Sequence, residues 1–355
     1  MMTSVILIVQ LADHRCTASY LDGILSLAGR SVLSEYDIRL KEDYGIFAFR
    51  ATEETAKDKL RFYLTENRGE GLVSYEGADV ELDLDLDDFG ICDPNLLEAQ
   101  IVTASLYALP QQLLRERTPS ATPNADRILR NESIINALPS RQSVDTGFRL
   151  DFSFIKGDTD LGALIPQAGH ALMRCEYALS RFGNRLKQPQ SRDGFFQNET
   201  EYIIGGQLSD AANAEKVKGY IVEIRTPINV ANIYADPERL AEAAAVATAA
   251  AAATGGTATA AAIFAVVLSW AIADSRKEAD VLVGGGTVDG LDYEKYLLIF
   301  LCVSDRETML LRIADLIQIN LKGSYYEGFL LSEHFAGLRL RAAYAGDRYE
   351  YAQQY

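Results

Sequence analysis

The residue types that carry most metal and nucleophile chemistry are scarce in this sequence. The three histidines lie far apart: His14, His170 and His334. The four cysteines include no C-x-x-C pair: Cys16, Cys92, Cys175 and Cys302. These spacings argue against a zinc site, a histidine-based triad and a dense disulfide scaffold. We expect each cysteine to be a small buried hydrophobic residue, and we expect no cofactor.

Basic residues are also in short supply. The chain of 355 residues has 34 Lys and Arg against 50 Asp and Glu, a formal net charge of -16. A surface with this charge repels phosphate backbones, so nucleic acid is not expected as a partner. Hydrophobic residues make up 48% of the chain, which is enough for about two or three cores of ordinary size.

The N-terminal segment 1–11 is apolar but has neither the basic leader nor the cleavage site of a signal peptide. As a helix of about 1.5 Å per residue, it is too short to cross a hydrocarbon core of about 30 Å. Two interpretations stay open: the first turns of a core helix, or the distal end of a membrane or signal helix whose upstream part was removed or not included. Apolar residues continue at helical spacing toward Leu40, which predicts a helix of about 35 to 40 residues.

Alternation with period two predicts β-strands in three places. Residues 78–88 (ADVELDLDLDD) alternate apolar with acidic side chains, and residues 147–155 repeat the alternation. Residues 335–344 and 348–355 flank a short turn and predict a hairpin. The acidic face of the first strand supplies the only calcium candidates, Asp83, Asp85 and Asp87, although the EF-hand loop pattern is absent. A solvated face that resists aggregation is the other interpretation.

Helix starts carry recognisable caps. Thr52, the pair Asp93-Pro94, Ser209 and the pair Asp236-Pro237 each precede a helical pattern. Residues 304–307 (SDRE) form a capping box that assigns Ser304 as the cap of another helix.

A stretch of 31 residues, 243–273, carries no charge. Its first part is mostly alanine and threonine, its second part (AIFAVVLSWAIA) is strongly apolar, and Gly255-Gly256 lies between them. This pattern favours a buried hairpin of two helices over a membrane span or one helix broken by glycine.

The sequence therefore predicts an α+β protein with a long N-terminal pilin-like helix, an antiparallel sheet covered by helices, and a helical second half with an alanine-rich helical hairpin. We divide it into five parts. These are the long helix, a first α/β part of the head, a connection with a strand, a helical region and a C-terminal hairpin segment, at residues 1–40, 41–118, 119–160, 161–321 and 322–355.

Several phrases, taken in order along the chain, resemble an uncharacterised family of bacterial envelope proteins, found chiefly in clostridia and their relatives and similar to TadE/TadG-type pilin-like proteins. The phrases are SVLSEYD (31–37), EDYGIF (42–47), ILR (128–130), LPS (138–140), ETEYIIGG (199–206) with Asn213, LSWA (268–271), DYEKY (292–296), DRETMLLR (305–312) and DLIQIN (315–320).

The resemblance implies a non-catalytic, extracytoplasmic subunit or accessory protein of a tight-adherence-like surface filament. Its partners would be copies of itself or other pilin-like subunits, with a membrane as a further partner of the N-terminal helix. The chain resembles a version that lacks the start of that helix. The expected assembly residues are Val5, Ile6, Ile8, Val9, Leu11, Tyr20, Ile24 and Leu27. One departure is that Val5 stands at the fifth position, where type IV pilins typically have glutamate.

Three alternatives stay open at this point. The chain could be a monomeric surface protein that is tethered to a membrane or binds calcium. It could be an enzyme that uses the acidic strand face, which would require burial to separate the pKa values of paired carboxylates. It could also be an intracellular scaffold in which the alanine-rich hairpin is ordinary core.

Overall fold

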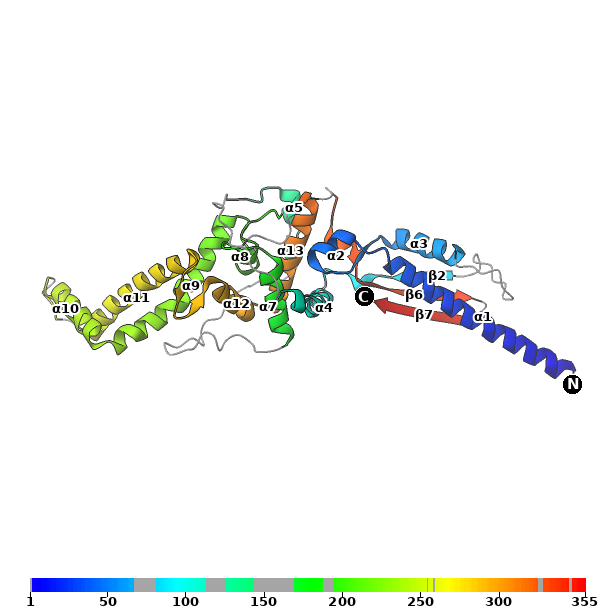
Figure 1. Cartoon of the computed structure of the whole chain (residues 1–355), viewed down its shortest axis with the longest axis horizontal. Helices are drawn as coiled ribbons and strands as arrows, with labels where there is room; N and C mark the ends of the chain where they lie inside the picture. The colour runs from blue at the N-terminus through cyan, green and yellow to red at the C-terminus, as the bar shows by residue number, and fades with distance from the viewer. Residues whose placement is uncertain are drawn as a thin grey trace. The chain divides into compact units, whose positions relative to one another are not determined.

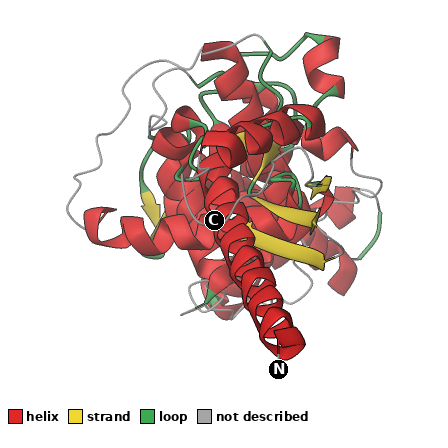
Figure 2. Ribbon diagram, turned by 90° about the vertical axis from the view of Figure 1, so that its right-hand side faces the viewer, coloured by secondary structure: helices red, strands yellow, loops and turns green. Residues whose placement is uncertain are grey.

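The computed structural model describes residues 2–66, 81–112, 126–142, 169–187, 194–253, 255–257, 259–324, 328–344 and 347–355. The chain divides into two compact units: unit 1, formed by Met1–Ala104 and Tyr325–Tyr355, and unit 2, formed by Ser105–Ser324. Helices predominate and the strands form small antiparallel sheets (Figure 2), which confirms the α+β class. The strand predicted at 147–155 lies outside the described residues.

The described residues of unit 1 form α-helices and two small antiparallel sheets. Its helices are α1 (Met2–Leu33), α2 (Ile38–Tyr44), α3 (Glu53–Glu66) and the start of α4 (Pro94–Gln112). Its strands are β1 (Phe49–Arg50), β2 (Glu81–Asp85), β5 (His334–Phe335), β6 (Gly337–Tyr344) and β7 (Asp347–Gln354). The order β2-β6-β7 makes one sheet and β1-β5 the other. The predicted C-terminal hairpin is therefore present as β6 and β7.

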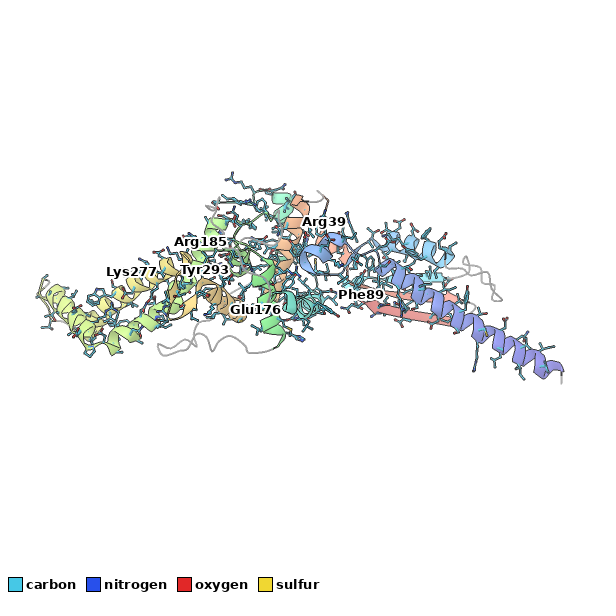
Figure 3. All side chains as sticks on the ribbon, in the orientation of Figure 1. Arg39, Phe89, Glu176, Arg185, Lys277 and Tyr293 are labelled. Atoms are coloured by element: carbon cyan, nitrogen blue, oxygen red, sulfur yellow. The ribbon has the colours of Figure 1, made fainter. Side chains whose placement is uncertain are left out.

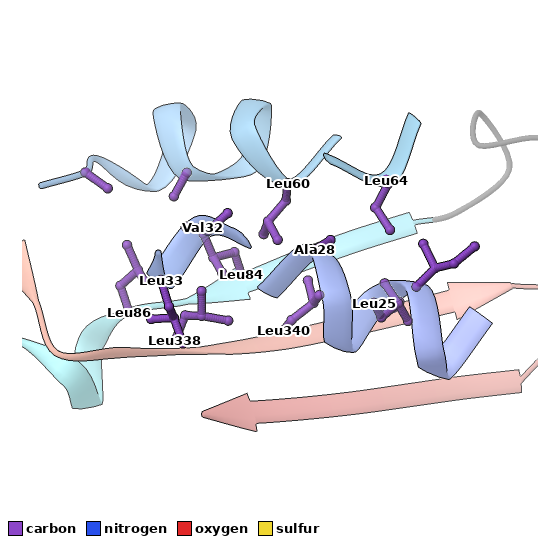
Figure 4. Packing of buried hydrophobic residues seen from close by; sticks show 14 of the residues in the cluster. Leu25, Ala28, Val32, Leu33, Leu60, Leu64, Leu84, Leu86, Leu338 and Leu340 are labelled. Carbon is purple, nitrogen blue, oxygen red and sulfur yellow. The ribbon is translucent and has the colours of Figure 1, made fainter. Parts of the chain in front are cut away.

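The core of unit 1 lies between α1, α3 and the three-stranded sheet (Figure 4). The buried hydrophobic residues of α1 follow the spacing of a single helical stripe: Leu21, Ile24, Leu25, Ala28, Val32 and Leu33. Leu60 and Leu64 of α3 approach this stripe from one side, and Leu340 of β6 approaches it from the sheet. The second part of α1 is thus a conventional amphipathic helix that packs onto a sheet.

Helix α1 ends at Leu33, earlier than the predicted end near residue 40. The reason is a second helix start. The side chain of Asp37 accepts hydrogen bonds from the backbone N–H groups of Arg39 and Leu40 and so caps α2. Because an N-cap residue needs an extended backbone, the chain leaves the helix before it.

The packing of α1 on β7 depends on Gly29, where a Cβ atom would lie 2.5 Å from Cε1 of Tyr351. We expect Gly29→Ala to destabilise unit 1 by about 1–3 kcal/mol, because the overlap outweighs the helix propensity gained. Gly23→Ala on the same helix is the matched control, since no atom of the described residues lies within 4 Å of its Cβ position, and it should stabilise by about 0.5–1 kcal/mol. Urea unfolding monitored by circular dichroism compares the two. Equal effects of both changes would show that α1 does not pack closely at Gly29.

Unit 2 is mostly helical. Its helices, besides the end of α4, are α5 (Glu132–Asn136), α6 (Pro139–Gln142), α7 (His170–Arg181), α8 (Glu199–Gly205), α9 (Asp210–Ala235), α10 (Pro237–Ala253), α11 (Ala260–Val283), α12 (Tyr293–Val303) and α13 (Arg306–Ser324). A two-stranded ribbon, β3 (Thr287–Val288) and β4 (Leu291–Asp292), precedes α12. The two units differ in their bounds from the five predicted parts, because the first and last segments of the chain belong to one unit.

The uncharged stretch forms the predicted helical hairpin of α10 and α11 (Figure 1), and Gly255 adopts a positive φ of 74° between the two helices. The prediction that the hairpin is buried holds for one face only. Ala243 and Ala247 of α10 are buried, whereas most of its other alanines are exposed. Val267 and Ala271 of α11 complete a small core with α9.

Most predicted caps are confirmed. The side chain of Ser209 accepts a hydrogen bond from the backbone N–H of Ala212, and Asp236 accepts from those of Glu238 and Arg239. The capping box at 304–307 was assigned one residue too early. Asp305 accepts from the N–H of Thr308, whereas the Ser304 hydroxyl bonds back to the carbonyl of Phe300 at the end of α12.

Candidate functional site

The first turns of α1 form an exposed apolar surface, which we call the apolar N-terminal surface. It consists of Val5, Ile6, Leu7, Ile8, Val9 and Leu11. Each of these side chains is between 55% and 67% exposed. Successive residues of a helix point about 100° apart, so residues 5–9 cover its whole circumference. An amphipathic helix would need only one apolar stripe, and a helix that is apolar all round is typically one that is enclosed on all sides.

The eight expected assembly residues do not all belong to this surface. Val5, Ile6, Ile8, Val9 and Leu11 belong to it, together with Leu7, which the sequence did not single out. Farther along α1, Leu27 is 48% exposed. Tyr20 packs against the core of unit 1.

Ile24 is a correction to the expected set, because it is buried in the core of its own chain at 5% exposure. It lies on the stripe that faces the sheet, and it is therefore inaccessible to a second molecule while unit 1 is folded.

Among the described helices, none is both long enough and apolar enough to cross a membrane.

The acidic strand face is balanced by arginines from the neighbouring strand. In the antiparallel register of β2 and β6, Asp83 lies opposite Arg341 and Asp85 lies opposite Arg339. The Arg339 guanidinium approaches Asp85 at 3.1 Å and Asp88 at 2.9 Å, and Arg341 approaches Asp83 at 3.6 Å. The face that the alternation predicts as wholly acidic is therefore one side of an exposed network of ion pairs.

The calcium candidates do not gather into a cation site. Asp87 belongs to a short 3-10 helix (Asp87–Phe89), where its backbone N–H donates to the side chain of Asp85. Within the described residues, no three His, Cys, Asp or Glu side chains are grouped so that they could hold a metal ion. His14, His170 and His334 therefore belong to no such group of three among these residues.

Unit 2 contains a buried acidic network that the sequence did not reveal. Glu199 and Glu201, in the first turn of α8, are both fully buried. Glu199 accepts hydrogen bonds from the backbone N–H of Gly183 and from the Asn320 side chain. One carboxylate oxygen of Glu201, Oε1, accepts from the N–H of Arg185 at 2.9 Å and from the hydroxyl of Tyr293 at 2.8 Å. Figure 3 labels Arg185 and Tyr293, the two residues that donate these hydrogen bonds.

Two aspartates extend the network. Asp210 accepts hydrogen bonds from the backbone N–H groups of Gln197 and Asn198. Asp315 of α13 accepts from the hydroxyl of Tyr202 at 2.8 Å and from the N–H of Ser140 at 2.9 Å. The network thus connects α6, α8, α9, α12 and α13 through carboxylates.

Burial sets the protonation of these groups. It raises the pKa of Glu199 and of Glu201 from 4.5 to about 7, against the lowering effect of their hydrogen bonds. Burial also raises the pKa of Asp210 and Asp315. The oxygen Oε2 of Glu201 is buried and has no hydrogen-bond partner among the described residues, which fits a carboxyl that carries a proton near neutral pH.

The network holds a cation beside the end of α8. The Arg312 guanidinium donates to the carbonyl groups of Ile203 and Ile204, each at 2.8 Å. It lies so close to Gly206 that a Cβ atom there would be 2.5 Å from Nη2. These contacts are made within the fold, so the network positions helices relative to one another.

Comparison with known proteins assigns a family. The profile of a family of unknown function, DUF5702, matches residues 121–289 and 287–346, more than half of the chain. The chain belongs to the DUF5702 family. No curated protein and no solved structure matches it.

The DUF5702 match includes the whole buried acidic network and the helices that it connects. It also reaches into β6 of unit 1. The apolar N-terminal surface lies outside the matched residues, so family membership gives no information about α1.

Proposed function

We propose that this DUF5702 protein is a non-catalytic, pilin-like subunit of a bacterial surface filament, similar to TadE/TadG-type proteins and located outside the cytoplasm. Its partners are copies of itself or related pilin-like subunits, which it contacts through the first turns of α1. The observation that carries the proposal is that one continuous helix is apolar on every side at its start and amphipathic over its second part.

This division of α1 matches the needs of a filament subunit. The stripe from Leu21 to Val32 attaches the helix firmly to the sheet of unit 1. The apolar N-terminal surface extends the same helix beyond that core, where packed helices of neighbouring subunits would enclose all of its sides. Residues 5–11 have no charged side chain, so they can be buried without removing a side-chain charge from water.

The magnitude of burial supports association. Covering one exposed Val, Leu or Ile side chain contributes roughly 1–2 kcal/mol when the side chain is already part-covered. Six such side chains give a gross gain on the order of 10 kcal/mol, before the cost of association is subtracted. The charge of -16 on the chain would meanwhile keep the remaining surfaces of neighbouring subunits solvated.

The test is to place a charge on this surface. Ile8 is 66% exposed, and we expect Ile8→Asp to weaken self-association at least about 30-fold, because a carboxylate would be buried among apolar helices. Phe62→Asp is the matched control: Phe62 is an apolar residue of α3 with 58% exposure, and the change should leave association unaltered. Sedimentation velocity and negative-stain electron microscopy over a concentration series measure the assemblies.

The outcomes separate the proposal from its nearest rival. Wild-type chains that stay monomeric at high concentration, with or without phosphatidylcholine vesicles, would contradict it. If the chain is monomeric in buffer but binds such vesicles, and Ile8→Asp abolishes the binding, the result would support a membrane-tethered accessory protein instead of a filament subunit. If Ile8→Asp and Phe62→Asp reduced assembly equally, association would not depend specifically on the apolar N-terminal surface.

A further inference from the structure

Two cysteines that are 127 positions apart in the sequence meet inside unit 2. Cys175 lies on α7 and Cys302 in the last turn of α12, and these two helices pack against each other (Figure 1). The two thiols share a hydrogen bond with an Sγ–Sγ distance of 3.5 Å. Cys175 is fully buried, whereas Cys302 is half-buried.

We propose that Cys175 and Cys302 are the site of a reversible disulfide that joins α7 to α12. A disulfide has an S–S length of about 2.05 Å, so the sulfur atoms need to approach by about 1.5 Å. Rotation about the Cα–Cβ bonds accomplishes most of this approach. The rest of the approach requires a small movement of the end of α12, which stops one residue after Cys302, at Val303.

The exposure and the pKa of the two thiols determine which of them reacts first. The hydrogen bond with Cys175 lowers the pKa of Cys302, and the charge of Arg174 lowers it further, while burial opposes both effects. The same hydrogen bond, together with burial, raises the pKa of Cys175. Cys302 is therefore the thiol that an external oxidant reaches first, and Cys175 is the thiol that resolves the reaction.

The oxidant is a disulfide compound, such as an oxidised dithiol protein or oxidised glutathione. The Cys302 thiolate attacks one sulfur of that disulfide, a mixed disulfide forms, and one thiolate leaves. Cys175 then loses its proton to water and attacks Sγ of Cys302, and the second thiolate leaves. Two protein thiols are oxidised, the external disulfide is reduced to two thiols, and the electrons balance.

The bond closes a long loop, and this predicts a large effect on stability. Cross-links across a hundred residues or more restrict the unfolded chain strongly. For a unit of this size, the oxidised protein should melt roughly 5–15 °C above the reduced protein. Reduction by dithiothreitol should reverse the shift.

The experiment uses the full chain with Cys16→Ser and Cys92→Ser, which leaves only the proposed pair. After incubation with oxidised glutathione, intact mass should fall by two hydrogen atoms, native and denatured alkylation should find no free thiol, and the melting temperature should rise. Adding Cys302→Ser provides the matched control, in which no shift should occur. Non-reducing peptide mapping of the wild-type chain gives the same readout if the double variant does not fold.

Either of two results would overturn the inference. One is a chain that keeps both thiols after prolonged oxidation. The other is a stable glutathione adduct on Cys302 that Cys175 does not displace. Because the purified chain is oxidised whether or not it assembles, this result is independent of the filament proposal.

Discussion

Glu201→Gln should make the protein more stable than wild type above neutral pH, by about 3 kcal/mol at pH 8, and the difference should fall to about 1 kcal/mol near pH 5. The reason is that Glu201 is fully buried and its pKa is raised from 4.5 to about 7. Glutamine keeps the shape of the side chain and never carries the charge. Its carbonyl oxygen can still accept from Arg185 and Tyr293, as Oε1 does in the wild type.

The sign follows from proton linkage. Between pH 4.5 and about 7 the folded chain binds more protons at Glu201 than the unfolded chain, so stability falls as the pH rises. The contribution is fully present below pH 4.5 and is lost once the pH passes about 7. The difference between the pKa of Glu201 in the folded chain, about 7, and its ordinary value of 4.5 corresponds to about 3 kcal/mol of stability. Glu199, whose pKa is raised to the same value, keeps a similar slope in the variant.

Carboxyl groups whose pKa is lowered in the folded chain affect stability at a lower pH. The pKa values of Glu35 and Asp305 are lowered below 4.5 and 3.8, so the stability that these carboxylates supply is lost only in stronger acid. The protein should therefore be most stable in mildly acidic solution.

Urea unfolding at pH 5, 6, 7 and 8 measures the effect of Glu201→Gln. The control is Glu215→Gln, the same change at an exposed position of α9, which should follow the wild-type curve within about 0.5 kcal/mol. A variant that is destabilised equally at every pH would show that Glu201 is ionised and stabilising in the folded chain.

Gly206→Val should be among the most damaging single substitutions, with a loss of about 3–5 kcal/mol. Gly206 ends α8 with a positive φ of 66°, a conformation that is strained for a β-branched residue. The new side chain would also displace the Arg312 guanidinium, which is held by the carbonyl groups of Ile203 and Ile204.

Two further variants separate these causes. Gly206→Asn tolerates the left-handed backbone and should retain only the clash with Arg312, so its loss should be smaller. Gly219→Ala lies on the exposed face of α9, where no atom in the described part of the chain is within 4 Å of its Cβ position, and it should stabilise slightly. Denaturant unfolding gives all three values. If Gly206→Asn and Gly206→Val were equally stable, backbone strain would not contribute.

Local signals in the sequence predicted local structure well. A cap needs only a few neighbouring residues, so Thr52, Asp93, Ser209 and Asp236 were placed correctly from their immediate context. The hairpin of β6 and β7 and the helical pair α10 and α11 were predicted for the same reason: turn residues separate two regular patterns.

Such local signals do not predict contacts between residues that are far apart in the sequence. Nothing near Asp85 indicates that Arg339, 254 positions away, would neutralise it. Glu199 and Glu201 were passed over because acidic residues are ordinary in the first turn of a helix, where the dipole favours them. Their burial depends on α12 and α13, which come a hundred positions later. The contact between Cys175 and Cys302 was hidden in the same way.

The discontinuous make-up of unit 1 has a consequence for biosynthesis. Strands β6 and β7, which cover the stripe on α1, follow all of unit 2 in the chain, so a ribosome synthesises them after unit 2. Until then, Leu25, Ala28 and Val32 have no sheet to pack against, while unit 2 is already complete in the nascent chain. Unit 2 should therefore mature first. The apolar stripe of α1 is not covered by β6 and β7 until those strands have been synthesised.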